Sequence, residues 1–284
     1  MSGPLLGAHA SISGGTPLAI DRAEALAASA CQIFVKSPNQ WRAKGIAPGE
    51  AEAFRSRQAE SPVRKVVAHA AYLINLAAVD SAVRERSVAA LVDELQRCRQ
   101  LALRGLVLHP GAHMGAGETT GLARIARSLD RVLSRLPTDT PPVLLENTAG
   151  QGTVLGYRLE HLAEIIDRSA YGERIGICID TCHAFAAGYA IDDPEALHAF
   201  LERIESLFGL DRLGAMHLND SRFPFDSRRD RHANIGQGEI GLQPFADLLA
   251  SDHVVDVPLI LETPIGDDGK GHERDLATLR RLSL

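Results

Sequence analysis

Short apolar runs alternate along the whole chain with longer segments in which apolar residues recur at helical spacing. The eight runs occupy residues 5–8, 32–35, 65–68, 105–108, 143–145, 175–179, 213–216 and 258–261. Eight parallel strands, each followed by a helix, are what a closed barrel requires. The pattern therefore predicts an α/β fold, the TIM (β/α)8 barrel.

The helical segments begin at recognisable residues. Thr16 and Asp193 each stand directly before a proline, and Ser81 opens the longest segment, 81–103. Within 81–103, small and apolar residues form one stripe, as expected for a helix that lies on a barrel. The stripe consists of Val83, Ser87, Leu91, Leu95 and Cys98. The connections 110–119 and 218–241 are unusually long, so we expect them to serve a functional site.

The composition is that of a globular protein with one large core: of 284 residues, 45% are hydrophobic and 23% are charged. No linker-like or low-complexity tract divides the chain, so we expect a single TIM-barrel domain over residues 1–284. No apolar stretch is long enough to span a bilayer, and residues 1–4 lead into the first strand without a signal segment. We therefore expect a cytoplasmic protein with no membrane partner. The four cysteines lack paired spacing, so we expect no disulfides.

The formal net charge of −6 argues against a protein that binds polyanions nonspecifically, because contacts to phosphate come from clustered lysines and arginines. Two local groups of basic residues nevertheless stand out. They are Arg222, Arg228, Arg229 and Arg231 in one segment, and Lys36, Arg42 and Lys44 in another. A basic face that contacts nucleic acid is compatible with this distribution.

Six side chains that favour metals each stand at the end of a separate apolar run: His69, His109, Glu146, Asp180, His217 and Glu262. Any one of them alone is explained as a hydrogen-bonded polar residue at a strand end. In a barrel, however, all six strand ends surround one face. Imidazoles and carboxylates gathered there would repel or lack partners unless cations bound them. The set therefore predicts a multinuclear metal site, and its mixture of nitrogen and oxygen ligands favours zinc or manganese.

A second candidate set lies in the loops and consists of His183, Asp230 and His232. Three protein ligands with one open position are the usual pattern of catalytic zinc. The alternative is that Asp230 and His232 are solvated loop residues. Cys182 is also soft enough for zinc, although buried cysteine is commonly inert. His9, at the end of the first run, is expected to donate a hydrogen bond that holds a metal ligand or the substrate in place.

Residues 236–241 match the glycine pattern of dinucleotide-binding loops letter for letter. That pattern carries meaning only between a strand and a helix, with an acidic residue downstream. Here it follows a long polar loop. We therefore interpret it as a structural turn and expect no nucleotide cofactor.

Taken together, these residues resemble the endonuclease IV family of apurinic/apyrimidinic (AP) endonucleases, which are metal-dependent DNA repair enzymes on a TIM barrel. The resemblance extends from about residue 7 to residue 263. It is most specific at residues 69–76 (HAAYLINL), 176–183 (GICIDTCH), 217–221 (HLNDS) with 230–232 (DRH), 146–150 (ENTAG) and 261–263 (LET).

The resemblance implies three zinc ions, with manganese possible in some positions. The implied ligand sets are His69, His109 and Glu146; Glu146, Asp180, His217 and Glu262; and His183, Asp230 and His232. The implied substrate is duplex DNA that contains an abasic site, hydrolysed 5′ to that site to leave a 3′-hydroxyl and a 5′-deoxyribose phosphate. Either Glu262 or Glu146 would handle the proton of the attacking water. A monomer is expected.

The resemblance also implies DNA contacts through Tyr72, Leu73 and Arg231. The family often has an arginine in the loop that contains residues 36–41, where this chain has Asn39, so the contribution of this loop to damage sensing differs. Two rival functions remain open. One is a sugar isomerase with divalent metals on the same barrel, and the other is a noncatalytic protein that binds damaged DNA.

Overall fold

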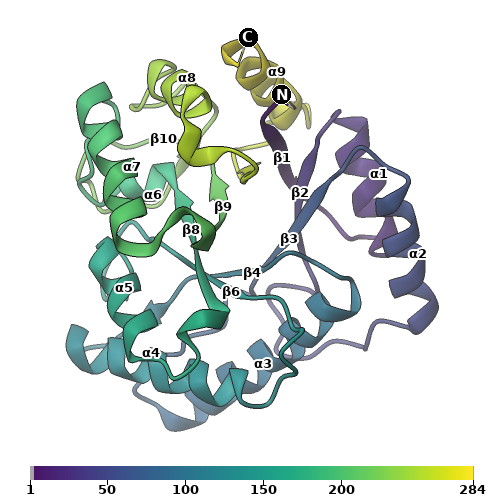
Figure 1. Ribbon diagram of the computed structural model, residues 1–284, viewed down its shortest axis with the longest axis vertical. Helices are drawn as coiled ribbons and strands as arrows, with labels where there is room; N and C mark the ends of the chain where they lie inside the picture. Colours follow the sequence, from purple (N-terminus) through teal and green to yellow (C-terminus); the bar gives the residue numbers. More distant parts are fainter. Residues whose placement is uncertain (1–2, 284) are drawn as a thin grey trace.

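Eight parallel strands form a closed barrel in the computed structural model, which describes residues 3–283 (Figure 1). Around the barrel the order is β1-β12-β9-β8-β6-β4-β3-β2, and the pairing of β1 with β12 closes it. The strands are β1 (Leu5–Ala10), β2 (Ala30–Phe34), β3 (Lys65–His69), β4 (Leu106–Leu108), β6 (Val143–Glu146), β8 (Ile175–Asp180), β9 (Leu213–His217) and β12 (Pro258–Leu261). Each one coincides with a predicted apolar run, so the predicted TIM barrel is confirmed.

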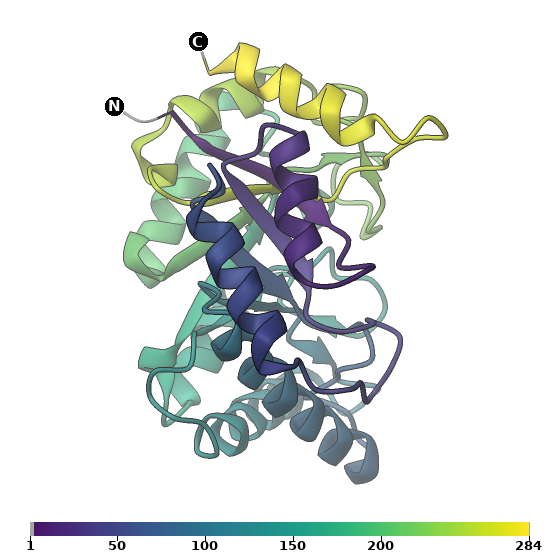
Figure 2. The same cartoon turned by 90° about the vertical axis from the view of Figure 1, so that its right-hand side faces the viewer.

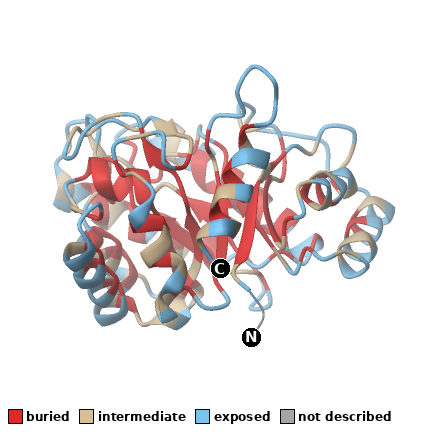
Figure 3. Ribbon diagram, turned by 90° about the horizontal axis from the view of Figure 1, so that it is seen from above, coloured by how far each residue is buried: buried red, intermediate tan, exposed pale blue. Residues whose placement is uncertain are grey.

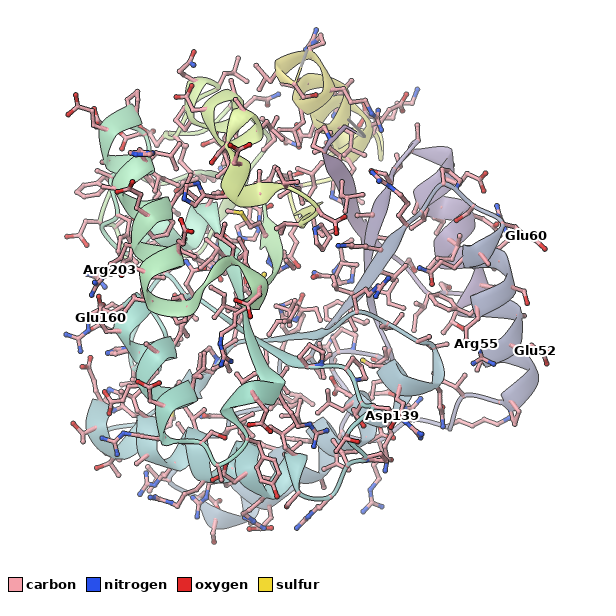
Figure 4. All side chains as sticks on the ribbon, viewed as in Figure 1. Glu52, Arg55, Glu60, Asp139, Glu160 and Arg203 are labelled. Carbon is pink, nitrogen blue, oxygen red and sulfur yellow. The ribbon has the colours of Figure 1, made fainter. Side chains whose placement is uncertain are left out.

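The helices surround the barrel, with their buried faces against the strands and their polar faces outside (Figure 3). They are α1 (Pro17–Ala25), α2 (Pro48–Ala59), α3 (Ser81–Gln100), α4 (Glu118–Leu133), α5 (Leu159–Arg168), α6 (Thr181–Ala186), α7 (Pro194–Phe208), α8 (Gln243–Ala250) and α9 (Gly271–Leu282). The last helix, α9, lies beside the first strand, β1 (Figure 2). Helices of neighbouring units are also linked on the outside, where Arg203 of α7 donates to Glu160 of α5 at 2.9 Å (Figure 4).

The helix starts agree only partly with prediction. Asp193 caps α7 by accepting a hydrogen bond from the backbone N–H of Ala196. The cap of α3 is Asp80 rather than the predicted Ser81, because the carboxylate of Asp80 accepts from a backbone N–H in the first turn. Thr16 precedes α1 but does not cap it, since its hydroxyl donates to Glu50 of α2 at 3.0 Å.

One side chain from every strand fills the barrel interior. This layer consists of Leu5, Ala30, Val67, Val107, Leu144, Cys178, Ala215 and Ile260. Leu144 occupies the space left by three glycines, since a Cβ atom added to Gly105, Gly176 or Gly214 would lie less than 3.0 Å from its side chain. The barrel is therefore a packed core rather than a pore.

Side chains alternate along a strand, so the residue two positions beyond each member of this layer also faces inward. These residues lie at the carboxyl end of the barrel. On β2 this residue is Gln32, while on β1 it is Gly7, and the next inward-facing residue of β1, four positions beyond Leu5, is His9. The other six strands or their ends supply the six predicted metal-binding residues. The same periodicity that fills the core thus assembles the site above it.

Two short hairpins order the long connections on this face. In one, β5 (Gly111–Ala112) pairs antiparallel with β7 (Val154–Leu155), and in the other β10 (Asp220–Ser221) pairs with β11 (His232–Ala233). All four cysteines are free and buried. Among residues 3–283, no helix is long and apolar enough to cross a membrane.

Candidate metal centre

Glu146, at the end of β6, lies fully buried at the centre of the site. Its Oε2 atom is 3.1 Å from Nε2 of His69 and 2.9 Å from Nε2 of His109. The other nitrogen of His69, Nδ1, donates to the backbone carbonyl of Ala70 at 2.8 Å. That hydrogen bond fixes the imidazole so that Nε2 faces the carboxylate.

The second oxygen of Glu146 faces a different group of residues. Oε1 lies 2.9 Å from Nδ1 of His217, and the same nitrogen is 3.3 Å from Oε2 of Glu262 and 3.7 Å from Oδ2 of Asp180. His217, Glu146 and Asp180 are completely buried, while the side chain of Glu262 is 19% exposed. Within this second group, Glu262 is therefore the residue that is open to solvent, while His109 opens the first group with a side chain that is 37% exposed.

A third group adjoins the other two. The carboxylate of Asp180 caps helix α6 by accepting from the backbone N–H of His183 at 2.8 Å, which fixes that residue at the barrel mouth. His183 uses Nδ1 to donate to the carbonyl of Asn147, so its Nε2 faces Oδ1 of Asp230 at 3.2 Å. His232, on β11, approaches Asp230 from the opposite side, with Nε2 3.3 Å from the same oxygen.

Within each group, one ligand atom per residue can be chosen so that all lie within 4.8 Å of one another. The three groups are His69, His109 and Glu146; Glu146, Asp180, His217 and Glu262; and His183, Asp230 and His232. All nine predicted ligands are thus brought together. Cys178 and Cys182 lie close enough to join such groups, but burial raises the pKa of the Cys182 thiol to about 12, which disfavours the thiolate that binds metal.

Four imidazoles of the cluster have a raised pKa in the protein without metal, namely those of His69, His183, His217 and His232. Burial lowers the pKa of His69, but the hydrogen bond and charge of Glu146 outweigh this effect and raise that pKa to about 9. The pKa of His232 also rises to about 9, because burial is outweighed by the charge of Asp180 and the close pairing with Asp230. Each imidazole therefore compensates the negative charge of a neighbouring carboxylate.

The carboxylates in turn depend on this positive charge. Burial favours the neutral form of Glu146, yet the charges of His109 and His217 hold the pKa of Glu146 well below its usual range. Burial is likewise outweighed at Asp230, whose pKa is lowered by its close pairing with His183 and His232. Cations that bind here would supply the same compensation in place of the imidazole protons.

One buried nitrogen supports this interpretation. Nε2 of His232 is inaccessible to solvent and lies 3.3 Å from Oδ1 of Asp230, but it forms no well-aligned hydrogen bond with any of the residues that the structure describes. Its other nitrogen, Nδ1, donates to the backbone carbonyl of Glu262 at 3.2 Å, which leaves Nε2 available as a lone-pair donor directed into the third group. A buried imidazole nitrogen of this kind is a suitable ligand for zinc.

The site also contains a residue that was missing from the sequence analysis, Gln32 of β2. Its amide oxygen accepts from Nε2 of His217 at 2.8 Å, and its amide nitrogen donates to Oε1 of Glu262 at 2.6 Å. The same nitrogen lies 3.1 Å from Nδ1 of His9, which is itself 3.7 Å from Glu262. Gln32 therefore fixes two candidate ligands, and the supporting position predicted for His9 agrees with this arrangement.

Two asparagines complete the support of Asp180. Nδ2 of Asn219 donates to Oδ2 of Asp180 at 2.7 Å, and Oδ1 of Asn219 accepts from the backbone N–H of Glu262 at 2.9 Å. Asn147 pairs with the backbone of Asp180 through both ends of its amide. Sequence reasoning placed both asparagines in motifs without a role. Asn147 directly follows the candidate ligand Glu146, and Asn219 stands two residues after His217. This closeness in sequence was the signal that could have indicated a supporting role.

A cavity of about 360 Å³ lies directly above the cluster. It is lined by His9, Phe34, His69, Tyr72, His109, His183, Asp230, His232, Glu262, Thr263 and His272. The ring of Tyr72 is 67% exposed and packs edge-on against Phe34 at 5.4 Å, so this pair forms an apolar wall beside polar ligands. His272, which appeared unremarkable in the sequence, lines the rim because its Nε2 donates to the carbonyl of Thr263.

One of the four predicted DNA-contacting residues lines this cavity. Tyr72 lines it, Leu73 is half-buried beside it, and Asn39 is exposed in the loop after β2. Arg231 is exposed, and its guanidinium donates to the carbonyl of Asp230 at 2.6 Å. Of the predicted basic groups, Lys36 is not free, because it is buried and paired with Glu94 at 3.1 Å.

The segment 222–231, which contains Arg222, Arg228, Arg229 and Arg231, is called the arginine loop below. It lines a second hollow, of about 370 Å³, next to Asp230. The guanidinium of Arg228 lies 4.7 Å from the ring centroid of Tyr157, and that of Arg229 lies 4.6 Å from the ring centroid of Phe223. Both arginines therefore rest on aromatic rings. Their positive charge stands beside the metal cluster, where it can attract an anionic substrate.

The glycine-rich segment 236–241 forms a turn, as predicted, and its backbone N–H groups bind a carboxylate of the protein itself. Oδ2 of Asp220, which is fully buried, accepts from Gly236 and Gly238, and Oδ1 accepts from Ile240 and Ser221. A Cβ atom at Gly238 would lie 2.3 Å from the carbonyl oxygen of Ser221, so only glycine fits there. These amides are not available to a nucleotide.

Comparisons with known proteins agree with this geometry. Residues 20–282 match a family described as xylose isomerase-like TIM barrel. A probable endonuclease 4 of Chloroflexus aurantiacus is 50% identical over 98% of both chains, and one of Geobacter sulfurreducens is 46% identical over 98% of this chain and 94% of the relative.

Solved structures give the same result. The crystal structure of endonuclease IV from Thermus thermophilus superposes with a TM-score of 0.87 at 35% identity, with 98% of each chain covered. A D-tagatose 3-epimerase-like protein superposes with a TM-score of 0.73, but at 19% identity it shares only the fold. The chain therefore belongs to the endonuclease IV family, on a xylose isomerase-like TIM barrel.

Proposed function

We propose that the protein is a DNA repair enzyme that hydrolyses the phosphodiester bond 5′ to an abasic site in duplex DNA, with three bound zinc ions. One observation carries the proposal. Each carboxylate oxygen of the buried Glu146 faces a different set of histidines, with Oε2 towards His69 and His109 and Oε1 towards His217. A single carboxylate in this position suits the bridging of two cations.

The residues that would hold the ions are the three groups described above, with Glu146 shared by the first two. When bound, zinc ions supply Lewis acidity towards phosphate oxygens and lower the pKa of a coordinated water. Manganese is a possible occupant of some positions, because the mixture of ligands also suits it. Three zinc ions per chain are the expected occupancy.

The chain itself orients the reaction. Glu262 is the partly exposed carboxylate of the second group, and Gln32 and His9 hold its Oε1 in place. In this position Glu262 is suited to orient a water molecule and accept its proton, while the buried Glu146 is suited to hold charge. Both remain the candidate catalytic residues. The arginine loop, including Arg231, would provide positive charge towards the DNA backbone.

The wall of the cavity would supply selectivity for damage. An abasic nucleotide must leave the base stack to reach a site at the bottom of a cavity. The exposed ring of Tyr72 and the neighbouring Leu73 are suited to fill the resulting gap, and Asn39 is suited to a weaker polar contact. We further propose that the chain is one catalytic domain that acts as a monomer in the cytoplasm.

A sugar isomerase on the same barrel is the main rival. It would need neither the third ligand group nor the arginine loop, because its substrate is small and uncharged. A noncatalytic binder of damaged DNA is disfavoured for another reason, since it would have no use for nine converging ligands. An enzyme that binds and hydrolyses a phosphodiester would use the nine converging ligands, including the third ligand group, and also the positive charge of the arginine loop.

The test is incision of a duplex that contains one stable abasic-site analogue, with an undamaged duplex as control. We expect one cut 5′ to the abasic site, loss of cutting with a chelator, and recovery when zinc is returned. Extension of the product by a polymerase would show the 3′-hydroxyl. No incision by protein carrying three zinc ions, or epimerisation of a ketose by the same sample, would overturn the proposal.

A further inference from the structure

Helix α3 carries a group of charged residues on its inner face, where a helix of this fold usually presents apolar residues. Glu94 is 1% exposed and Arg97 is 5% exposed. Neither contacts the metal-binding residues. Both are instead directed at the connections that follow β2 and β3, which lie next to one another in the barrel.

Glu94 joins these two connections with a single carboxylate. Its Oε2 accepts from the backbone N–H of Ala71 at 3.0 Å, directly before Tyr72. Its Oε1 lies 3.1 Å from Nζ of Lys36, the buried lysine that follows β2. Lys36 in turn donates to the backbone carbonyl of Trp41 at 3.0 Å, so the pair reaches across the 36–41 loop.

Two further residues of α3 also hold these connections in place. The guanidinium of Arg97 donates to the carbonyls of Ala43 and Lys44, at 3.2 and 3.0 Å, and thereby holds the far end of the same loop. Ser87 accepts from the backbone N–H of Asn75 at 3.0 Å and holds the far end of the other connection. Each connection is thus fixed on α3 at two points.

The bonds made by Glu94 and Lys36 are costly ones. A buried ion pair loses the hydration of two charges, and an apolar pair of similar volume is often equally stable or more so. Unlike an apolar pair, the ion pair fixes the positions of two loops, because its atoms bind specific backbone groups of each loop. One of those loops presents Tyr72 to the cavity, and the other, which contains Asn39 and Trp41, directly follows the strand whose last residue, Phe34, lines the same cavity.

We infer that the buried pair Glu94–Lys36 is a positioning device that sets the distance between these two loops and so determines how tightly the wall of the cavity fits the substrate. The inference rests on the proposed function, since it takes duplex DNA with an abasic site as the substrate. Neither residue touches the metal ligands, so the pair affects substrate fit and not the chemical step.

Trp41 provides a direct readout, because it is the single tryptophan of the chain and lies in the anchored loop. It is half-buried, with the guanidinium of Arg86 5.3 Å from its ring centroid. The test variants are Glu94→Gln, Lys36→Met and the double variant. Glu85→Gln is the matched control, since Glu85 lies on the same helix but is exposed and pairs with Arg131 of α4.

For Glu94→Gln we expect the KM for abasic duplex to rise roughly tenfold while kcat and bound zinc stay near the wild-type values. Quenching of Trp41 fluorescence by acrylamide, measured without DNA, should increase. The double variant should be affected no more than either single variant, because the two residues act as one unit. Glu85→Gln should change neither KM nor quenching.

Unchanged KM in Glu94→Gln and Lys36→Met would overturn the inference, whether or not the fluorescence changes. A fall in kcat with loss of zinc would also overturn it, because the pair would then support the metal centre. If the wild-type protein does not cut abasic duplex, the proposed function has failed instead. In that case direct binding of the duplex replaces KM as the readout of the pair.

Discussion

Oε1 of Glu146 lies 2.9 Å from Nδ1 of His217, with both side chains fully buried. Their strands, β6 and β9, are separated by β8 in the barrel, so the contact crosses the top of the interior rather than following one sheet edge. It exists because both residues stand two positions after an inward-facing core residue. The chemistry of the site thus depends on the inward alternation of the strands more than on any single loop.

Zinc loading should release protons at neutral pH. In the protein without metal, the pKa values of His69 and His232 are raised to about 9, so both imidazoles are protonated below that pH and must lose their protons to bind metal. A pH indicator in weakly buffered solution would measure the release on addition of zinc. The release should diminish above about pH 9, where these imidazoles are already neutral. Zinc uptake without proton release at neutral pH would contradict the prediction.

Glu262→Gln should remove most turnover while leaving folding and DNA binding largely intact. The amide keeps the volume and one oxygen but loses the charge and basicity that the water requires, so we expect a loss of roughly 10²- to 10⁴-fold in kcat. Cleavage and binding assays carried out in parallel would check this. Glu273→Gln, on the exposed side of α9, is the matched control. Turnover near the wild-type rate would place Glu262 away from the reacting atoms.

Gln32→Leu should weaken metal binding although Gln32 is not itself a ligand. Leucine fills the buried volume but leaves Nε2 of His217 and Oε1 of Glu262 without the partners that orient them. Loss of such supporting bonds typically lowers metal affinity by about 10- to 100-fold. Competition with a zinc chelator would measure the change. Gln243→Leu, at the exposed start of α8, should have no effect, and equal zinc affinity in both variants would refute the role of Gln32.

The sequence alone was sufficient to predict the barrel, because apolar runs of strand length recur eight times and few other folds are compatible with that pattern. It was also sufficient to bring together six of the nine candidate ligands, since strand ends of a barrel converge on one face, whereas the set of His183, Asp230 and His232 was implied by the family resemblance. Gln32 was missed for a physical reason. It lies within its strand and not at the end, and only the inward alternation seen in the closed barrel shows that it faces His217.

Loop contacts were harder to predict, because they join residues far apart in the chain without any periodicity. Lys36 was grouped with surface arginines, yet it is buried by its pairing with Glu94, 58 positions later, an arrangement that no local pattern indicates. In the same way, the glycine-rich turn was identified, but its anchor, Asp220, was not. A buried carboxylate that binds four backbone N–H groups can be found only once the loop is folded.

Asp220→Asn should loosen the turn at 236–241 and lower thermal stability. The amide offers one acceptor oxygen in place of two and directs an NH₂ group at backbone donors, so buried N–H groups lose their partners at a cost of about 1 to 3 kcal/mol. Thermal denaturation would measure the loss, and limited proteolysis should cut the 222–241 segment faster. Asp226→Asn, exposed in the same loop, is the control. Equal denaturation midpoints would show that the four hydrogen bonds contribute little.

The double change Tyr72→Ala and Leu73→Ala should weaken cleavage of an abasic site in duplex DNA without loss of zinc. The ring of Tyr72 is 67% exposed at the edge of the cavity and is supported from behind by Phe34, so it is suited to enter the gap left by a displaced nucleotide. Asn39 offers neither the stacking plane nor the charge of an arginine. Filling of the gap in the base stack should therefore depend more heavily on Tyr72 and Leu73. The expected cost is about 1 to 3 kcal/mol, on the scale of a lost base-stacking platform.

Cleavage measured against enzyme concentration would test this cost, with a single-stranded abasic substrate as the internal control, because no helix has to be held open there. Asn39→Arg should act in the opposite direction and improve duplex binding modestly, since it adds a planar cation to the exposed loop after β2. Met114→Ala, also exposed on this face of the barrel, is the matched apolar control. If the double variant cleaves duplex and single strand as the wild type does, the helix is opened by a different loop, and the arginine loop next to Asp230 becomes the segment to test.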